Sequence, residues 1–421
     1  MTTTSTPLVT PQAAGQTRRG LPRWVVAAGI VAVGIGVLTL TTTLTGQIQL
    51  TSRGTTQAAV LLLLPILLAG LGGLWSERSG IINIGLEGMM ILGTWGAAWA
   101  GYQWGPWAAV IGGTIFGALG GLLHAIATVT FNVNHIVSGV AITLLGMGVT
   151  KYLSTLLFFP VSHNPRQSPR VHGFETFSVQ PLADWLAQLE SQQRVLVSDI
   201  AGILGGLVSG LTPLVIVAFV LVPISYFVLW RTRFGLRLRS CGENPVAAES
   251  LGVNVFRYKY VAVIISGALA GLGGAALTLN PGQLGYLEGQ TGGRGYIGLA
   301  AMIFGNWRPG GLLAGSALFG YVDGVQLRAG GEAVHALLYA TSILALIVAV
   351  LWVARRRWKP ALFALGAGAV VYVVYMVIPE VPREFASYAP QLVTLLVLAV
   401  ASQRLRPPAA IGMEYRRGEG D

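Results

Sequence analysis

Cysteine and lysine are nearly absent from this 421-residue chain, which contains one cysteine, Cys241. A single cysteine excludes a disulfide or a cysteine-based metal site within the chain. The only lysines are Lys151, Lys259 and Lys359, and none of them follows a glycine. The chain therefore lacks the Gly-Lys-Ser/Thr sequence with which P-loop proteins bind nucleotide phosphates. If ATP drives this protein, another chain must hydrolyse it.

Charged residues are also scarce, at 10% of the chain, whereas hydrophobic residues make up 53%. The mean hydropathy is +0.65. This composition is typical of one polytopic membrane domain, and not of the two or three soluble domains that the length would otherwise suggest. The net charge of +11 does not indicate nucleic acid, because the basic residues lie at helix ends and form no patch with interleaved aromatics. We expect a lipid bilayer as partner and no nucleic acid.

Side-chain sets that carry catalysis or bind metal are missing as well. The chain has no Ser-His-Asp, Cys-His or paired-carboxylate set, and its five histidines show no close ligand spacing. His163 and His172 share one predicted outer loop, where we expect solvated side chains and not metal ligands. We therefore predict that the chain is not an enzyme and has no catalytic, cofactor-binding or metal site.

Long apolar runs dominate what is present, and many reach the ~20 residues needed to cross a bilayer. They predict an all-α, polytopic membrane helix bundle of about twelve transmembrane helices. The predicted helices span 24–44, 56–75, 84–102, 106–128, 135–159, 211–230, 257–279, 294–305, 310–327, 334–354, 360–378 and 385–402. Residues 1–23, rich in Thr and Pro, are expected to be a disordered cytoplasmic tail.

Most of the 27 basic residues fall on one side of these helices. Arg231, Arg233, Arg237 and Arg239 crowd the start of the polar segment 231–256, and such clusters remain on the cytoplasmic side of a membrane. We therefore predict that 231–256 is a cytoplasmic loop and that both ends of the chain are cytoplasmic too.

The centre of this loop reads Gly-Glu-Asn-Pro-Val-Ala-Ala-Glu-Ser-Leu-Gly over 242–252. Asn244 can cap a helix, Pro245 suits its first position, and Gly252 can end it. The pattern predicts a short exposed helix. One interpretation is an ordinary loop helix that covers the bundle. The other is a docking element, because the small side chains of Ala247 and Ala248 let another surface approach closely.

Two halves of the chain share an internal repeat. Leu-Ala-Gly-Leu-Gly-Gly occurs at 68–73 and again at 269–274, and Trp-x-Pro occurs at 104–106 and again at 307–309. The predicted helix at 56–75 runs inward across the membrane, and its repeat counterpart at 257–279 runs outward. The repeat is therefore inverted. Transporters with inverted repeats bind solute at mid-membrane beside interrupted helices. We expect those interruptions at 79–85 and 291–298.

Polar residues near these interruptions are candidates for the solute pathway. A carboxylate within an apolar helix is costly and is by default a functional hypothesis. The alternative is that Glu87 caps the broken helix or pairs with Arg78. Helix capping is likewise the alternative for the two asparagines before the helix at 135–159. The candidates are Asn83, Glu87, Asn132, Asn134 and Tyr296.

A second set of polar residues lies just before the short helix predicted at 294–305 and at its first position. Glu288, Gln290 and Arg294 are expected at the outer mouth, where a soluble binding protein would dock. A solvated loop is the equal alternative for these three residues.

The loop sequence RTRFGLRLRSCGENPVAAESLG at 231–252 resembles the coupling loop of permeases of ATP-binding-cassette importers. The branch is that of the branched-chain amino acid, ribose and nucleoside permeases. SERSGIINIGLEGMMILG at 76–93 resembles the signature of its nucleoside or simple-sugar subgroup. Further matches are GRGYIGLAAMIFGNWRP at 293–309 and RLRPPAAIGMEYRRG at 404–418. The resemblance covers most of 55–328 and the end of the chain.

This resemblance implies a permease subunit of the bacterial cytoplasmic (inner) membrane. The implied partners are a cytoplasmic ATPase, a second permease, identical or homologous, and an extracytoplasmic solute-binding protein. The ATPase would act on the coupling loop through Gly242, Glu243, Asn244, Pro245, Ala247, Ala248 and Gly252. The implied solute is a nucleoside or a related sugar-containing molecule. Simple sugars and branched-chain amino acids are alternatives within the family, and an ion-coupled secondary carrier is the alternative outside it.

The C-terminal part departs from the family pattern. We expect a ten-helix permease core, with nine of its helices in 24–328 and one closing helix after them. The segment 329–402 instead holds three apolar runs. The first two of them, within 334–379, are expected to form an extra hairpin. Residues 403–421 are expected to be a cytoplasmic tail.

Overall fold

The computed structural model describes residues 23–378, 381–382 and 405–416. Within these residues the regular structure is helical, apart from two isolated bridges that join Gln167 to Leu287 and Phe177 to Leu211. Eight of the described helices are long and apolar enough to cross a membrane. The expected polytopic helix bundle is therefore confirmed. The predicted helix at 385–402 and nearly all of the predicted N-terminal tail lie outside the described residues.

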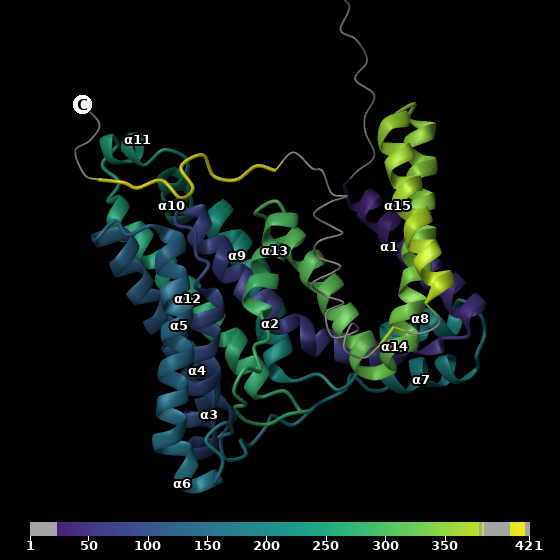
Figure 1. Ribbon diagram of the computed structural model, residues 1–421, viewed down its shortest axis with the longest axis horizontal. Coiled ribbons are helices and arrows are strands. Elements are labelled where there is room, and N and C mark those ends of the chain that lie inside the picture. The colour runs from purple at the N-terminus through teal and green to yellow at the C-terminus, as the bar shows by residue number, and fades with distance from the viewer. Residues whose placement is uncertain (1–22, 379–380, 383–404, 417–421) are drawn as a thin grey trace, which may run out of the picture.

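The described helices follow the predicted apolar runs closely (Figure 1). Short π-helical turns extend α4 and α5, and α14 contains a kink. The elements are α1 (Arg23–Thr45), η1 (Ile48–Thr51), α2 (Arg53–Arg78), α3 (Leu86–Trp104), α4 (Pro106–Ala125), η2 (Ile126–Thr130), α5 (His135–Leu153), η3 (Ser154–Phe158), α6 (Phe159–Ser162), α7 (Leu182–Ser191), α8 (Val197–Val208), α9 (Pro213–Arg231), α10 (Arg233–Glu243), α11 (Pro245–Ser250), α12 (Val255–Thr278), α13 (Arg294–Phe304), α14 (Pro309–Ala354) and α15 (Trp358–Val377).

Helix α2 is the centre of the bundle. Its N-cap residue is Ser52, whose hydroxyl accepts a hydrogen bond from the Thr55 amide. Its sequence is apolar on all sides, as expected for a helix surrounded by others, and most of its residues are buried. It packs against α12, α13 and α14. The first and second halves of the chain therefore meet along α2.

Close approach at glycines sets how these helices cross. A Cβ on Gly72 would lie 2.5 Å from the Ser266 carbonyl oxygen, and one on Gly273 would lie 3.1 Å from that of Pro65. As the residue number rises along α2, the number of its neighbour on α12 falls, so the two helices are antiparallel. Small residues permit such contacts, on which helix association in lipid relies.

The pairs α4–α12 and α2–α14 use the same device. Gly117 on α4 lies against Gly267 and Gly271 of α12, and Gly320 on α14 lies against Ala59 and Leu63 of α2. Each of these glycines would place a Cβ within 3 Å of a neighbouring backbone atom. The two halves of the chain thus share a packing scheme in which a Gly-bearing helix lies on the central α2–α12 pair.

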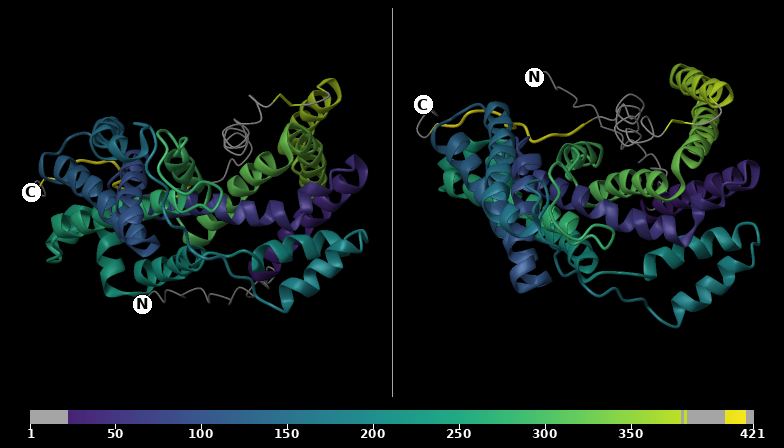
Figure 2. Two further views of the ribbon diagram at one scale, coloured as in Figure 1. Left: turned by 90° about the horizontal axis from the view of Figure 1, so that it is seen from below. Right: turned by 60° about the horizontal axis from the view of Figure 1, so that its bottom comes forward.

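The predicted helices at 310–327 and 334–354 form one element, α14, which is broken at Gly330 by a non-helical conformation of φ 66° and ψ −156°. The second part of α14 pairs with α15 as a hairpin, and the basic turn Arg355–Arg357 joins the two helices. This hairpin stands at one side of the molecule, away from α3, α4 and α5 (Figures 1 and 2). Stacking of His335 on Tyr375, at a ring distance of 4.4 Å, is one contact within it.

The polar connections gather at opposite ends of the bundle. Helices α10 and α11 and the segment 405–416 lie at one end, and α6 and α7 lie at the other (Figure 1). Between α6 and α9 the chain forms a helical hairpin, α7–α8, which packs on the start of α2. The predicted outer segment thus contains regular structure that the sequence pattern did not fully indicate.

The glycine contacts generate the first prediction. Replacement of Gly271 by Ala would force a Cβ to within 2.2 Å of the Gly113 carbonyl oxygen, so the α4–α12 pair must separate. We expect a loss of about 1–3 kcal/mol of stability despite the better helix propensity of alanine. Thermal unfolding of the purified protein measures this loss.

Gly148→Ala is the matched control, because a Cβ there meets no atom within 4 Å. This variant should be as stable as the wild type or slightly more stable. Equal unfolding temperatures for Gly271→Ala and Gly148→Ala would contradict the proposed packing.

Candidate functional site

The candidate site begins with α10 and α11 at one end of the bundle. The Thr232 hydroxyl accepts a hydrogen bond from the Gly235 amide and starts α10. The Asn244 side chain accepts one from the Ala247 amide at 3.0 Å, Pro245 opens α11, and the chain leaves it through Gly252 at φ 79°. The short capped helix expected from the sequence is present.

The two alanines of α11 lie in different environments. Ala247 is exposed, whereas Ala248 is only 2% exposed and packs with Cys241, Val255 and Tyr415. Only Ala247 therefore offers a small side chain to a second surface. Burial in this cluster raises the pKa of the Cys241 thiol to about 11.

Two apolar side chains of the central part of this loop, 242–252, face outward. Leu251 is 85% exposed and Val246 is 38% exposed. Both belong to the segment that the sequence pattern singled out, but they were not among the predicted residues. A leucine next to the helix-ending glycine of a polar loop was the signal that could have identified Leu251.

Gly242 fixes α10 against the end of α2. A Cβ at this position would lie 2.3 Å from the Arg78 carbonyl oxygen, so a larger residue cannot fit without displacing the chain. Opposite it, Gly80 has φ 93° and lies in the break after α2. These two glycines let the loop touch the broken backbone directly.

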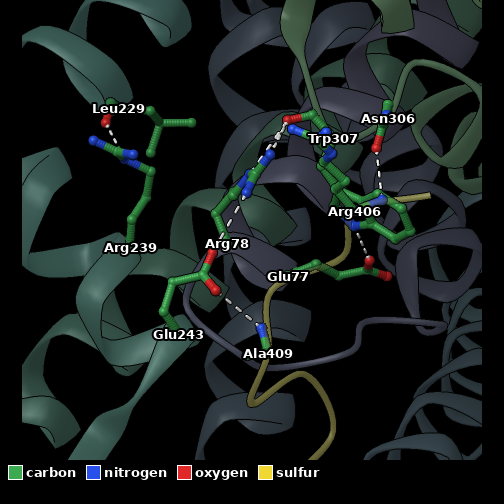
Figure 3. Close-up of polar contacts among 9 residues, drawn as sticks. All are labelled: Glu77, Arg78, Leu229, Arg239, Glu243, Asn306, Trp307, Arg406 and Ala409. Carbon is green, nitrogen blue, oxygen red and sulfur yellow. Dashed lines mark hydrogen bonds and ion pairs between the residues drawn. The ribbon is translucent and has the colours of Figure 1, made fainter. Parts of the chain in front are cut away.

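Arg78 connects three separate parts of the chain (Figure 3). Its guanidinium donates to the Trp307 carbonyl oxygen at 2.7 and 3.2 Å, and Nη1 lies 3.9 Å from Glu243 Oε1. The Trp307 indole N–H in turn donates to buried Glu77 at 2.6 Å. The end of α2, the end of α10 and the turn between α13 and α14 are thereby joined. Glu243 is half exposed, so its ion pair with Arg78 contributes little by itself.

The segment 405–416 adds a second connection at this end. The Arg406 amide donates to Asn306 Oδ1, and the Ala409 amide donates to Glu243 Oε2 at 3.1 Å (Figure 3). The Ala410 amide donates to the Gly242 carbonyl oxygen at 2.9 Å. The sequence pattern predicted only a cytoplasmic tail here, because contacts of an irregular segment leave no periodic signal.

Asn83, one of the predicted pathway residues, is completely buried in the break between α2 and α3. Its amide nitrogen donates to Ser266 Oγ on α12 at 2.8 Å, whereas its Oδ1 atom has no hydrogen-bond partner. An unpaired buried acceptor is costly and is open to a donor from a bound molecule.

Glu87 caps another helix. Its Oε1 accepts a hydrogen bond from the Gly293 amide at 2.9 Å, and its Oε2 accepts one from the Gly295 amide at 2.7 Å. A carboxylate at a helix N-terminus satisfies free amides and complements the helix dipole. Glu87 thus joins α3 to the start of α13, which agrees with the capping alternative, although the capped helix belongs to the other half of the chain.

The other predicted pathway residues are less central. Asn134 caps α5 by accepting from the Ile136 and Val137 amides, and Asn132 adopts a left-handed conformation with φ 50°. Tyr296 is 42% exposed on the first turn of α13. The two asparagines have clear local structural roles, whereas Tyr296 presents its ring at the surface.

Two buried histidines support the first break, a role that the sequence did not indicate. His124 Nε2 lies 3.1 Å from the Ile82 carbonyl oxygen, and the Ile82 amide lies 3.4 Å from His135 Nδ1. Ser138 lies 2.8 Å from His124 Nδ1. Side chains from α4 and α5 thus occupy the hydrogen-bonding groups of the non-helical segment. No group of three metal-ligating side chains occurs among the described residues.

The three residues predicted to dock a binding protein have different surroundings. Glu288 is exposed and lies 3.5 Å from Arg166 of the segment between α6 and α7. Arg294 points inward and pairs with Asp323 of α14 at 3.3 Å. Gln290 is partly buried and donates to Thr278 Oγ1 at 3.4 Å. Only Glu288 of the three is an exposed surface residue.

The capping role of Glu87 is testable. Glu87→Ala leaves the buried Gly295 amide and the partly buried Gly293 amide without this partner, and loss of the buried one alone costs about 1–3 kcal/mol. Glu87→Gln retains one carbonyl acceptor but turns an NH₂ group toward the second amide, so it should be destabilised as well. Thermal unfolding should therefore rank the wild type above both variants. Exposed Glu175→Gln is the control, and a Glu87→Gln protein as stable as this control would contradict the cap.

Residues 55–353 match the family described as branched-chain amino acid transport system / permease component. The chain is 34% identical to the guanosine ABC transporter permease protein NupQ of Bacillus subtilis over 270 residues, which are 62% of this chain and 78% of that protein. It is 31% identical to the nucleoside ABC transporter permease protein NupC of Lactococcus lactis over 363 residues, 83% of this chain and 93% of that protein.

A third relative is the putative glucose ABC transporter permease protein TsgC13 of Haloferax volcanii. It is 36% identical over 285 residues, which are 66% of this chain and 76% of that protein. No solved structure matches the chain. The family match covers most of the chain, including α2 from its third residue, all of α3–α13 and the loop with α11. The chain therefore belongs to the permease-component family of branched-chain amino acid transport systems.

Proposed function

We propose that this permease imports a nucleoside, with guanosine as the first candidate, across a bacterial cytoplasmic membrane. The observation that carries the proposal is the 31% identity to a nucleoside ABC transporter permease, which extends over 83% of this chain and 93% of the relative. A guanosine ABC transporter permease is among the further relatives. Likeness over nearly the whole length favours the same class of solute.

A separate cytoplasmic ATPase would supply the energy, because this chain has no P-loop sequence. Helix α11 is the proposed contact with it. Val246, Ala247 and Leu251 face outward, and an apolar side chain on a protruding element can enter a pocket of a partner. A second permease subunit and an extracytoplasmic binding protein complete the proposed importer. Glu288 is the residue of the outer group best placed to meet the binding protein.

The proposed topology has about twelve spanning helices, with α10, α11 and 405–416 on the cytoplasmic side. The Arg355–Arg357 turn belongs to that same side. Two inverted halves would surround the solute path. This symmetry is supported by the antiparallel α2–α12 pair, in which Gly72 meets Ser266 and its repeat counterpart Gly273 meets Pro65.

The proposed mechanism moves α11 when the ATPase subunits close. The displacement would pass through α10 to Arg78 at the end of α2, and from Arg78 to the turn at Trp307. Asn83 is the strongest pathway candidate, because its unpaired oxygen can accept a hydrogen bond from a ribose hydroxyl or a base amino group. Glu87 would instead keep α13 joined to α3 during the movement.

A simple sugar is the second candidate solute, and the 36% identity to a putative glucose ABC transporter permease favours it. Sugars and nucleosides share hydroxyl groups, and a purine adds a planar ring with its own donors and acceptors. A site for branched-chain amino acids would instead have to bind their charged ammonium and carboxylate groups. Competition between these solutes therefore separates the candidates.

The role of α11 predicts the effect of added charge at its surface. Ala247→Glu and Leu251→Asp should fold normally, since both residues are exposed, but should abolish most ATP-coupled uptake because a carboxylate enters the proposed ATPase contact. Val195→Asp, at a valine 66% exposed between α7 and α8, is the control and should transport normally. Wild-type uptake by both α11 variants would exclude α11 from coupling.

The solute assignment is tested by uptake of labelled guanosine and adenosine into cells that produce the permease with its ATPase and binding protein. We expect uptake that requires a working ATPase and persists in excess ribose or leucine. Ribose inhibition would move the assignment to simple sugars, and leucine inhibition to amino acids. Uptake that follows a proton or sodium gradient without the ATPase would identify an ion-coupled carrier.

A further inference from the structure

The segment 405–416, here called the tail strap, crosses the end of the bundle from the α13–α14 turn to α11 (Figure 1). It touches three separate places in order. The Arg406 amide binds Asn306 in the turn, the amides of Ala409 and Ala410 bind the end of α10, and the Gly412 amide binds the Gly80 carbonyl oxygen at 2.9 Å. Each contact uses strap backbone, so the path of the strap is fixed residue by residue.

Buried side chains anchor the strap. Ala410 and Tyr415 are each 6% exposed, whereas Met413 between them is 60% exposed. The Tyr415 ring lies 5.7 Å from the Phe256 ring, and Lys259 Nζ lies 5.3 Å above it. Cation–π contacts and apolar burial of this kind hold an irregular segment in one place.

Helix α11 depends on this anchor. It has only six residues, of which Ala248 alone is buried, and it lies between Asn244 and the turn at Gly252. Ala248 packs in one buried cluster with Cys241, Val255 and Tyr415, of which Tyr415 alone belongs to the strap. A helix this short has little stability of its own, so its position is determined by the surfaces that it touches.

We propose that the tail strap positions α11 and transmits its displacement to the α13–α14 turn, with Tyr415 as the positioning residue. This inference rests on the proposed ATP-driven function, because the displacement is the one caused by the ATPase. The strap provides a second route between α11 and the turn, beside the one through Glu243, Arg78 and the Trp307 carbonyl oxygen. It also holds the broken segment at Gly80, so one movement would reach the first interruption of the bundle as well as the α13–α14 turn.

The two routes differ in stiffness. The Arg78–Glu243 pair is 3.9 Å long with a half-exposed carboxylate, so solvent weakens it. The strap contributes backbone hydrogen bonds of 2.9 Å to Gly242 and Gly80, together with a buried aromatic anchor. Loss of the anchor should therefore weaken coupling more than the loss of one surface ion pair.

The test uses the complete importer in proteoliposomes and compares Tyr415→Ala, Tyr415→Phe and Met413→Ala. The measurement is the ratio of labelled guanosine imported to ATP hydrolysed. Tyr415→Ala should lower this ratio at least about tenfold while ATP hydrolysis and copurification of the ATPase persist, because assembly remains and transmission fails. Tyr415→Phe retains the ring and should keep most of the ratio, and Met413→Ala should behave as the wild type.

A second measurement needs no solute and no ATPase. Cys241 is the sole cysteine and is buried in the same cluster as Tyr415 and Ala248, with a thiol pKa of about 11 against an ordinary 9.0. This difference lowers the thiolate fraction near neutral pH roughly a hundredfold, so maleimide should label the wild type slowly. In Tyr415→Ala the thiol becomes accessible, and we expect labelling roughly tenfold or more faster.

Unchanged transport ratio and unchanged Cys241 labelling in Tyr415→Ala would overturn the proposal. Faster labelling with a normal ratio would also overturn it, since the strap would then position α11 without transmitting force. If the wild type shows no ATP-dependent uptake, the proposed function fails instead. The labelling experiment still decides whether the strap holds α11, because it depends only on the folded permease.

Discussion

Non-helical backbone inside an apolar bundle must find hydrogen-bond partners, because lipid offers none. In this permease the partners come from distant parts of the chain. The break after α2 is satisfied at Ile82 by His124 and His135 and at Gly80 by the Gly412 amide. The start of α13 is satisfied by Glu87 of α3. The interruptions that a transporter needs for solute binding are therefore also the points at which its helices are joined.

Glycine packing complements these joints. In lipid there is little hydrophobic drive for one helix to leave the bilayer for another, so association depends on close contact. Gly117 and Gly271 bring α4 and α12 together, and Gly320 brings α14 onto α2. Firmly packed helices with a few polar joints can move as units when one end is displaced, and α11 lies at that end (Figure 1).

The position of α11 explains why its sequence mixes small, apolar and polar residues. Gly242 allows contact with the end of α2, and Ala248 packs in a buried cluster with Tyr415. Leu251 remains free to contact another protein. Membership of the permease family agrees with this division, since such a subunit must meet a partner on one side and its own moving helices on the other.

The sequence by itself determined the positions of the long apolar helices, the membrane class and the family, because the length and polarity of apolar runs are local properties. It also indicated α11, since Asn244, Pro245 and Gly252 act on their own backbone. Only the tertiary structure decided the partners of Glu87, Arg78 and the tail strap. Those contacts join residues between about 100 and 330 positions apart, and neither periodicity nor capping patterns encode such separations. The tertiary structure also decided that Ala248 is buried and Ala247 exposed. These two identical neighbours differ in role only because the helix turns by ~100° per residue.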